Sequence, residues 1–205
     1  GALAGRVFPV AMSYVRCVRG LVSGIEYSAD APMNLDPADG RPVEMVLDLE
    51  RLAAEQPNAA WYDPSRRDMW RFGALMALDV RDPRDAAHIV ALGEGGTPVL
   101  DYASHPVAHA AGLKLGLKDE GRAHAGFGAN PTQSFKDRGM AMVVAQARRL
   151  GLTRLAVPTQ GNAGDSLAHY ALAAGLTVVV AMPDDTPAPI LGNVAAAAHR
   201  YPERV

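Results

Sequence analysis

The chain has 205 residues, of which 49% are hydrophobic and 20% are charged, and its formal charge at neutral pH is −2. A chain this apolar and this close to neutral can offset the entropy of ordering by burial, which argues against disorder. No basic excess is available to neutralise phosphates, which disfavours a nucleic-acid-binding domain. The single cysteine excludes an internal disulfide framework and a multi-cysteine zinc cluster.

Two features argue against secretion and membrane insertion. The amino-terminal stretch 1–15 is fairly apolar, but Arg6 and Pro9 interrupt it and no basic residues precede it, as they would in a signal peptide. The longest strongly apolar run, 176–182, is far too short to cross a bilayer. We therefore expect a cytoplasmic protein that binds neither a membrane nor nucleic acid.

The first ninety residues contain few strong signals. Residues 28–42 are rich in Asp, Pro and Ala and predict a loop. Asp36 and Asp39 lack the spacing and the closing Glu of an EF-hand, so they predict a solvated turn rather than a calcium site. Residues 43–49 alternate apolar and acidic side chains, which predicts a short strand. A short buried helix is predicted from the spacing of Trp70, Phe72, Leu75 and Met76.

Glycine-rich segments and apolar periodicity become clear after residue 89. Residues 92–98 predict a tight glycine-rich turn, 113–118 alternate as a strand does, and 121–130 are a loop with three glycines. A helix then begins near Ser134, a candidate N-cap, with Asp137 three residues later in a capping-box-like arrangement. The face predicted to be buried consists of Met140, Val143, Val144, Ala147 and Leu150, and Gly151 ends the helix.

Alternating strands and helices define the fold class. Residues 153–158 predict a strand, 161–164 a turn into a helix that Gly175 ends, and 176–182 a second strand, apolar as expected when both its faces are covered. A last Ala-rich helix extends toward His199. This alternation predicts an α/β fold, a parallel sheet with flanking helices and right-handed crossovers. Ligands in such folds bind where strand carboxyl ends meet helix N-termini.

Lys136 is the first residue with candidate chemistry, because it lies in the first turn of a predicted helix. The helix dipole disfavours a cation there, and a neutral lysine amine is the nucleophile that Schiff-base chemistry needs. The alternative is a surface lysine that Asp137 balances, beside Arg138. From the helix argument alone, this second interpretation is favoured because surface lysines are common.

The second candidate is the loop 158–164, with the sequence PTQGNAG. A glycine-rich loop between a strand and a helix exposes backbone N–H groups that can hold a carboxylate or a phosphate, and Asn162 could donate a further hydrogen bond. An ordinary strand-to-helix turn is the alternative. The loop matches neither the dinucleotide fingerprint nor the P-loop.

No metal site is expected from the sequence. The six histidines show no metal-ligand spacing. Cys17 has neither a second cysteine nor an obvious base beside it, so it predicts a buried, inert thiol.

Taken together, four segments resemble the threonine synthases, which are pyridoxal-phosphate enzymes of fold type II, the tryptophan-synthase-β-like group. They are LGEGGTP at 92–98, KDEG at 118–121, NPTQSFKDRGM at 130–140 and GNAG at 161–164. The resemblance covers about residues 43–199. It divides the chain into an N-terminal region, 1–88, with a degenerate zinc-ribbon-like segment and a linker, and the first part of the catalytic fold, 89–205, with the C-terminal half absent.

The resemblance implies specific roles. Lys136 would hold pyridoxal 5′-phosphate as a Schiff base and later shuttle a proton at the substrate's α and β carbons. Phe135 and Asn162 would contact the cofactor. The substrate carboxylate would be bound by Thr159, Gln160, Gly161 and Ala163. The family reaction converts O-phospho-L-homoserine and water to L-threonine and phosphate, with the cofactor as electron sink, and the full-length form could be a homodimer.

This chain departs from the family pattern at several places. Gln133 stands where the family usually has Gly, and residues 122–129 form an extra segment beside the expected site. Gly20 occupies the second position of a Cys-x-x-Cys pair that would begin at Cys17, so zinc is not expected. The family's cofactor-phosphate loop lies further downstream. These departures leave three alternatives open: another fold-type-II enzyme, such as a threonine dehydratase or a cysteate-synthase-like enzyme; an inactive remnant; and a small-anion-binding module.

Overall fold

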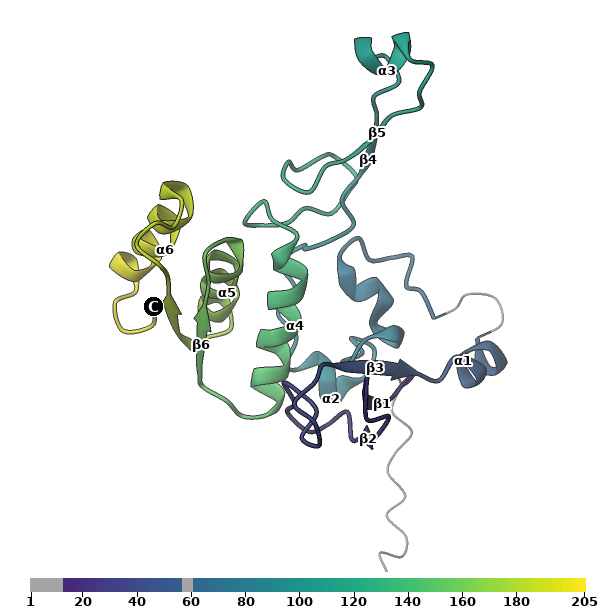
Figure 1. Ribbon diagram of the computed structural model, residues 1–205, viewed down its shortest axis with the longest axis vertical. Helices are drawn as coiled ribbons and strands as arrows, with labels where there is room; N and C mark the ends of the chain where they lie inside the picture. Colours follow the sequence, from purple (N-terminus) through teal and green to yellow (C-terminus); the bar gives the residue numbers. More distant parts are fainter. Residues whose placement is uncertain (1–12, 57–60) are drawn as a thin grey trace, which may run out of the picture. The chain divides into compact units, whose positions relative to one another are not determined.

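A computed structural model describes residues 13–56 and 61–205, which divide into two compact units. The first unit reaches to Pro64 and resumes over Arg71–Ala87, and the second contains Ser65–Trp70 and His88–Val205 (Figure 1). Residues 1–12, which make up most of the apolar amino-terminal stretch 1–15, lie outside the described residues. Within those ranges, no helix is long and apolar enough to cross a membrane.

A three-stranded antiparallel sheet forms the centre of the first unit. The strands lie in the order β2-β1-β3, with β1 at Val15–Gly20, β2 at Glu26–Tyr27 and β3 at Val43–Leu47. The strand predicted over 43–49 is therefore confirmed. Helix α1, Leu49–Glu55, follows β3, and a short helix α2 spans Pro83–Ala86. Cys17 is buried in β1, as expected.

The prediction of a solvated turn at Asp36 is wrong. Only 1% of this residue is exposed, and its carboxylate accepts hydrogen bonds from the hydroxyls of Ser23 and Tyr27 and from the backbone N–H of Ala38. Asp36 therefore organises the loop that joins β2 to β3, because a buried carboxylate needs such donors.

The predicted helix around Trp70 is a 3₁₀ helix, η1, at Met69–Leu75. Trp70 is fully buried, as predicted, whereas 39% of Phe72 is exposed. The Phe72 ring lies against the rings of Trp61 and Tyr62, with centroid distances of 6.3 and 5.4 Å. Residues two positions apart point to different sides of a helix, so the two aromatic residues do not enter one core.

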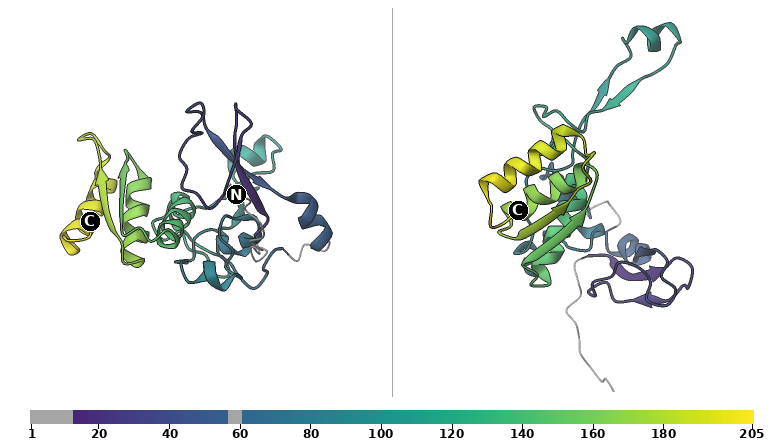
Figure 2. Two further views of the ribbon diagram at one scale, coloured as in Figure 1. Left: turned by 90° about the horizontal axis from the view of Figure 1, so that it is seen from below. Right: turned by 60° about the vertical axis from the view of Figure 1, so that its left-hand side comes forward.

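The second unit contains the parallel sheet that the sequence predicts. Strands β6, Arg154–Pro158, and β7, Thr177–Ala181, pair in parallel, and helix α5, Asn162–Ala173, connects them. Helices α4, Lys136–Arg149, and α6, Ala188–Arg200, both pack against α5 (Figure 2). The α/β fold class is thus confirmed. The expectation that both faces of the second strand are covered is wrong, because 62% of Val179 is exposed.

Helix α4 buries only part of the predicted face: Val144 and Ala147 are buried as predicted, and other members of that face are exposed. Val143 and Leu150 are 44% and 40% exposed. The buried residues are Asp137, Ala141, Val144, Ala145 and Ala147. The apolar pattern missed the rest of the buried face because it consists of a carboxylate, Asp137, and two small residues, Ala141 and Ala145. Gly151 and Gly175 end α4 and α5 with φ angles of 70° and 76°, as predicted.

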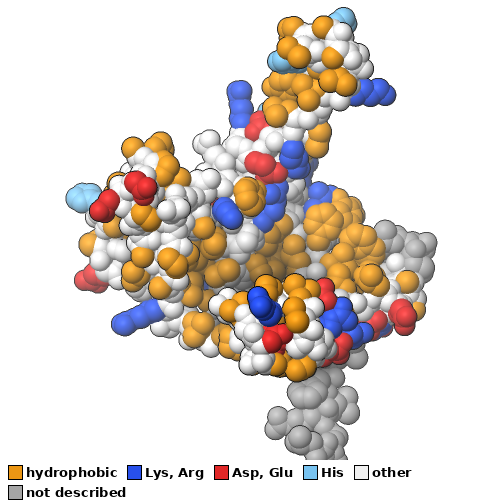
Figure 3. Space-filling model, in the orientation of Figure 1, with side chains coloured by type: hydrophobic (Ala, Val, Ile, Leu, Met, Phe, Trp, Pro, Cys, Tyr) orange, Lys and Arg blue, Asp and Glu red, His pale blue; other side chains and the backbone are white. Residues whose placement is uncertain are grey.

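A two-stranded antiparallel hairpin precedes α4. Strands β4, Val99–Asp101, and β5, Gly116–Lys118, flank the short helix α3, Pro106–Ala110. Leu100 pairs with Leu117, and the Tyr102 N–H donates to the Leu115 carbonyl. Tyr102, Leu115 and Leu117 are between 40% and 45% exposed, and hydrophobic side chains gather on this hairpin in Figure 3. One face of the hairpin is therefore apolar and open to solvent.

Replacing Leu115 and Leu117 together with Lys should reduce self-association of the chain, since contiguous exposed apolar surface promotes it. Helix content should remain unchanged, because neither side chain is buried. Light scattering over a concentration series provides the measurement. Leu152→Lys is the matched control, because that residue is 47% exposed and lies outside the hairpin. Equal self-association of all three proteins would contradict this prediction.

Candidate active site

The start of α4 and the start of α5 are tied together by the buried carboxylate of Asp137. This carboxylate is fully buried and accepts hydrogen bonds from the Thr132 N–H at 2.8 Å and the Thr132 hydroxyl at 2.7 Å. It also accepts one from the Ser166 hydroxyl of α5 at 2.6 Å. The adjacent Lys136 is thereby held near the first turns of the helix that begins at Asn162.

The predicted capping box is wrong, because Asp137 makes these bonds instead of reaching back to the N–H of Ser134. The N-cap of α4 is Phe135, one residue later than predicted. Ser134 still assists the helix start, since its Oγ accepts a hydrogen bond from the Lys136 N–H at 3.2 Å. Asp137 occupies a capping-box position in sequence but uses its oxygens for a tertiary contact.

Lys136 is the first residue of α4, and its side chain is exposed. Its Nζ lies 5.0 Å from the centroid of the Phe135 ring, which is itself 56% exposed. Within residues 13–56 and 61–205, no carboxylate forms an ion pair with this amine. The alternative in which Asp137 balances Lys136 does not hold, because the Asp137 oxygens face Thr132 and Ser166.

The loop 158–164 lies at the carboxyl ends of β6 and β7. Thr159 extends the pairing with β7 through its N–H, which donates to the Ala181 carbonyl, and its Oγ1 accepts a hydrogen bond from the Gly161 N–H at 3.1 Å. Gly161 is the N-cap of α5 and forms no side-chain capping bond. A cavity of about 550 Å³ is lined by Pro158, Thr159, Gln160, Ala181, Met182 and Pro183.

The structure therefore distributes the predicted residues over three neighbouring elements. Phe135 is the N-cap of α4 and Lys136 is its first residue. Thr159 and Gln160 line the cavity. Gly161 is the N-cap of α5, which begins with Asn162 and Ala163. Asn162 and Gln160 are exposed. Strand ends and helix starts meet here, which is where ligands bind in α/β folds.

Gly164 permits the close approach of α5 to the strands. A Cβ at this position would lie 2.5 Å from Cγ2 of Thr159 and 2.6 Å from Cγ1 of Val180. Real Cβ atoms do not come this close to other heavy atoms, so only glycine fits without a shift of the helix. The last glycine of the 161–164 segment therefore sets the distance between α5 and the cavity.

A second buried carboxylate, Glu94, connects the glycine-rich turn to α5. It is fully buried and accepts hydrogen bonds from Trp70 Nε1 at 2.6 Å, the Tyr170 hydroxyl at 2.7 Å and the Leu92 N–H at 2.8 Å. Burial and the negative charge of Glu94 raise the pKa of Tyr170. The Tyr170 phenol thus stays protonated and remains a donor.

A polar network joins three of the segments that resemble the threonine synthases. The buried Asn130 accepts from the Gly95 N–H at 3.1 Å and donates to Glu120, which also pairs with Arg138 at 2.7 Å. Burial raises the pKa of Glu120, but the hydrogen bond from Asn130 and the charge of Arg138 outweigh it and hold that pKa below its usual value. These segments are therefore physically connected.

The extra segment 122–129 is fixed at both ends. At its start, the Asp119 carboxylate accepts from the Arg122 N–H at 2.9 Å and contacts His124 Nε2 at 2.7 Å, which together hold the pKa of Asp119 at about 2. At its end, the N–H groups of Gly128 and Ala129 donate to carbonyls of the glycine-rich turn. The insertion is thus part of the network rather than a free loop.

Sequence reasoning missed the structural roles of Glu94, Glu120, Asn130 and Ser166. The available signal was the presence of acidic and amide residues inside glycine-rich, otherwise apolar segments. Such groups need donors and acceptors when they are buried. Among the described residues, no group of three or more His, Cys, Asp or Glu side chains could hold a metal ion.

Comparison with known proteins identifies the family. Residues 90–199, more than half of the chain, match the family model described as pyridoxal-phosphate dependent enzyme. The chain belongs to this family. It is 33% identical to a threonine synthase of Methanosarcina acetivorans over 188 residues, which are 91% of this chain and 40% of that relative. It is also 37% identical over 130 residues to one of Methanocaldococcus jannaschii, covering 63% of this chain and 28% of the relative.

A threonine synthase of Mycobacterium leprae is 40% identical over 94 residues, 46% of this chain and 24% of the relative. The resemblance found in the four sequence segments is therefore confirmed, and with it the fold type II class. The chain spans less than half of the length of these relatives.

Replacing Asp137 with Ala should lower the free energy of unfolding by about 3 kcal/mol, because the buried donors of Thr132 and Ser166 lose their acceptor. Urea unfolding followed by circular dichroism measures this change. Asp165→Ala is the matched control: its carboxylate accepts from Asn193 at an exposed position of the same region, and we expect a loss below about 1 kcal/mol. Similar losses at both positions would contradict the proposed tie between α4 and α5.

Gln133 has a φ angle of 61°, a left-handed conformation that disfavours residues with a Cβ. Replacing it with Gly should stabilise the chain by up to about 1 kcal/mol, because the relief of strain exceeds the added entropy of the unfolded state. The unfolding midpoint in urea measures the gain. In the control, Gln160→Gly, the midpoint should fall, because Gln160 has no positive φ to relieve. A lower midpoint for Gln133→Gly would refute the strain argument.

Proposed function

We propose that this chain carries the lysine-bearing part of a threonine synthase active site that uses pyridoxal 5′-phosphate. One observation carries the proposal: the Asp137–Ser166 hydrogen bond ties the first turn of α4, where Lys136 is exposed and forms no ion pair within the described residues, to the first two turns of α5. The names of the most similar relatives supply the reaction class.

The residues present fit the cofactor by their chemistry. An aldehyde needs an accessible primary amine, and Lys136 supplies one. Anionic groups need N–H donors, and the N-terminus of α5 offers them without a competing capping side chain. When bound, the cofactor withdraws electrons from the substrate's α carbon.

The chain's own groups then have distinct roles. The Nζ of Lys136 holds the cofactor and afterwards moves protons at the α and β carbons of the substrate. Phe135 and Asn162 orient the cofactor ring. The substrate carboxylate is bound and oriented by backbone and side-chain groups of Thr159, Gln160, Gly161 and Ala163.

The proposed substrate is O-phospho-L-homoserine, which reacts with water to give L-threonine and phosphate. We further infer a cytoplasmic enzyme and a homodimer in the full-length form, with residues 1–88 as a degenerate zinc-ribbon-like region plus linker and 89–205 as the first part of the catalytic fold.

A non-catalytic anion-binding module is the second candidate function. It is favoured by the strained Gln133 and by the extra segment 122–129, which is hydrogen-bonded to the glycine-rich turn. Both features lie close to the proposed site in sequence. Another fold-type-II reaction on a related amino acid would use the same lysine.

Incubation with pyridoxal 5′-phosphate followed by borohydride should label Lys136 faster than the other lysines. The chain has only three lysines, at 114, 118 and 136, so peptide mass spectrometry resolves every site. Lys136→Ala should lose most of the label. Lys114→Ala is the control, because that lysine is also exposed, and it should leave the labelling of Lys136 unchanged. Equal labelling rates at Lys114 and Lys136 would overturn the site assignment.

Phosphate release separates the two candidate functions. With O-phospho-L-homoserine and cofactor, an enzyme releases phosphate, and Lys136→Ala abolishes the release. An anion-binding module binds the substrate without releasing phosphate, with equal affinity in the wild-type chain and in Lys136→Ala.

A further inference from the structure

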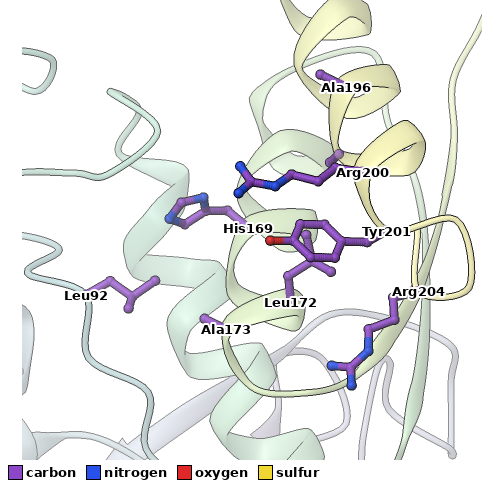
Figure 4. A pocket seen from close by; sticks show the side chains of 9 residues that line it. Leu92, His169, Leu172, Ala173, Ala196, Arg200, Tyr201 and Arg204 are labelled. Carbon is purple, nitrogen blue, oxygen red and sulfur yellow. The ribbon is translucent and has the colours of Figure 1, made fainter.

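A second cavity, of about 770 Å³, lies between α5 and α6 at the end opposite to the candidate active site. Its lining includes His169 and Leu172 of α5, Arg200 of α6, and Tyr201 and Arg204 beyond α6 (Figure 4). All of these residues belong to the second unit. Helix α5 has 12 residues, so its two ends are separated by about 18 Å. The cavity is therefore distinct from the loop 158–164.

Positive charge is concentrated around this cavity. No acidic side chain is found among the described residues that line it. In the described part of the chain, neither Arg200 nor Arg204 forms an ion pair with a carboxylate. Figure 4 shows the Arg200 guanidinium directed from α6 toward His169 of α5. The Arg204 guanidinium lies beside Gly175, at the end of α5.

Apart from His169, the rest of the lining is mainly apolar. Leu92 and Leu172 contribute branched side chains, whereas the facing positions on α6 include the small residue Ala196. The Tyr201 ring lies with its centroid 5.6 Å from the Arg200 guanidinium carbon. A largely apolar cavity of this size with a few polar groups at its edges is the usual form of a small-molecule site.

We propose that this cavity binds a small organic anion, in which an apolar ring carries a phosphate or carboxylate group. Arg200 would pair with the anionic group, since guanidinium pairs well with both oxyanions, and Arg204 on the other side of the Tyr201 ring would add to the positive charge. The ring would contact Leu172, Tyr201 and Leu92. Because the Leu92 N–H donates to Glu94, which also accepts from Tyr170, such a ligand contacts the turn that connects to α5.

Arg200 also stabilises α6 without any ligand, because a cation in the last turn of a helix interacts favourably with the helix dipole. Stability measurements alone therefore cannot test the proposal, and the test measures binding. The probes are phenyl phosphate, benzoate, inorganic phosphate and benzyl alcohol. None carries an aldehyde, so none reacts with the amine of Lys136.

The experiment is a titration of the ¹⁵N-labelled chain followed by amide chemical shifts. We expect saturable binding of phenyl phosphate or benzoate, with shifts at residues 172–175 and 196–204. Arg200→Gln should weaken this binding about tenfold, the effect of removing a charge-assisted hydrogen bond, and Arg204→Gln should weaken it by a smaller factor. Arg154→Gln removes an exposed arginine elsewhere in the unit and should leave affinity unchanged. Comparison of the two anions identifies the preferred head group.

Several results would overturn the proposal: no saturable binding of either organic anion, shifts confined to residues 158–164, or equal affinity in the arginine variants and the wild-type chain. Benzyl alcohol binding as well as the anions would show an apolar groove without charge recognition. Inorganic phosphate binding as well as phenyl phosphate would show that the ring contributes nothing. Circular dichroism of both arginine variants verifies that they fold.

Discussion

The hydrogen bond between the buried Asp137 carboxylate and the Ser166 hydroxyl is the constraint on which the candidate site depends. It joins the first turn of one helix to the second turn of another, and the same carboxylate binds the segment before the first helix through Thr132. A buried carboxylate without a cation is costly unless its oxygens are satisfied. The need to satisfy this carboxylate therefore fixes the arrangement of donors around Asp137. Because Lys136 is the adjacent residue, the same hydrogen bonds fix the position of its backbone.

Glu94 repeats this design one turn further along α5, at Tyr170. It lies in a turn between two glycines, yet it is buried and accepts hydrogen bonds from Trp70, Tyr170 and Leu92. With Asn130, Glu120 and Arg138, it explains why segments that are far apart in sequence form one structural unit. The motifs that identify the family thus contain several polar groups that are buried and hydrogen-bonded, beside exposed residues such as Lys136 and Asn162.

The sequence predicted the order of strands and helices after residue 150 well, because glycines, short apolar runs and connection lengths are local signals. It placed the candidate residues 159–163 at the junction of β6 and α5 for the same reason. It located only part of the buried face of α4, since apolar periodicity assigns no inward place to Asp137 and undervalues alanines. It also failed at Asp36 and Asp137, where tertiary partners override the local preference for turns and caps.

Gly164 has a consequence for sequence divergence. The N–H groups at the start of α5 belong to the backbone, so any residue except proline contributes them at 160, 162 and 163. What cannot vary is the distance of the helix from the strands, because a single methyl group at 164 would meet Thr159 and Val180. The placement of these N–H groups should therefore be most sensitive to substitution at Gly164, a residue that contributes no side chain of its own.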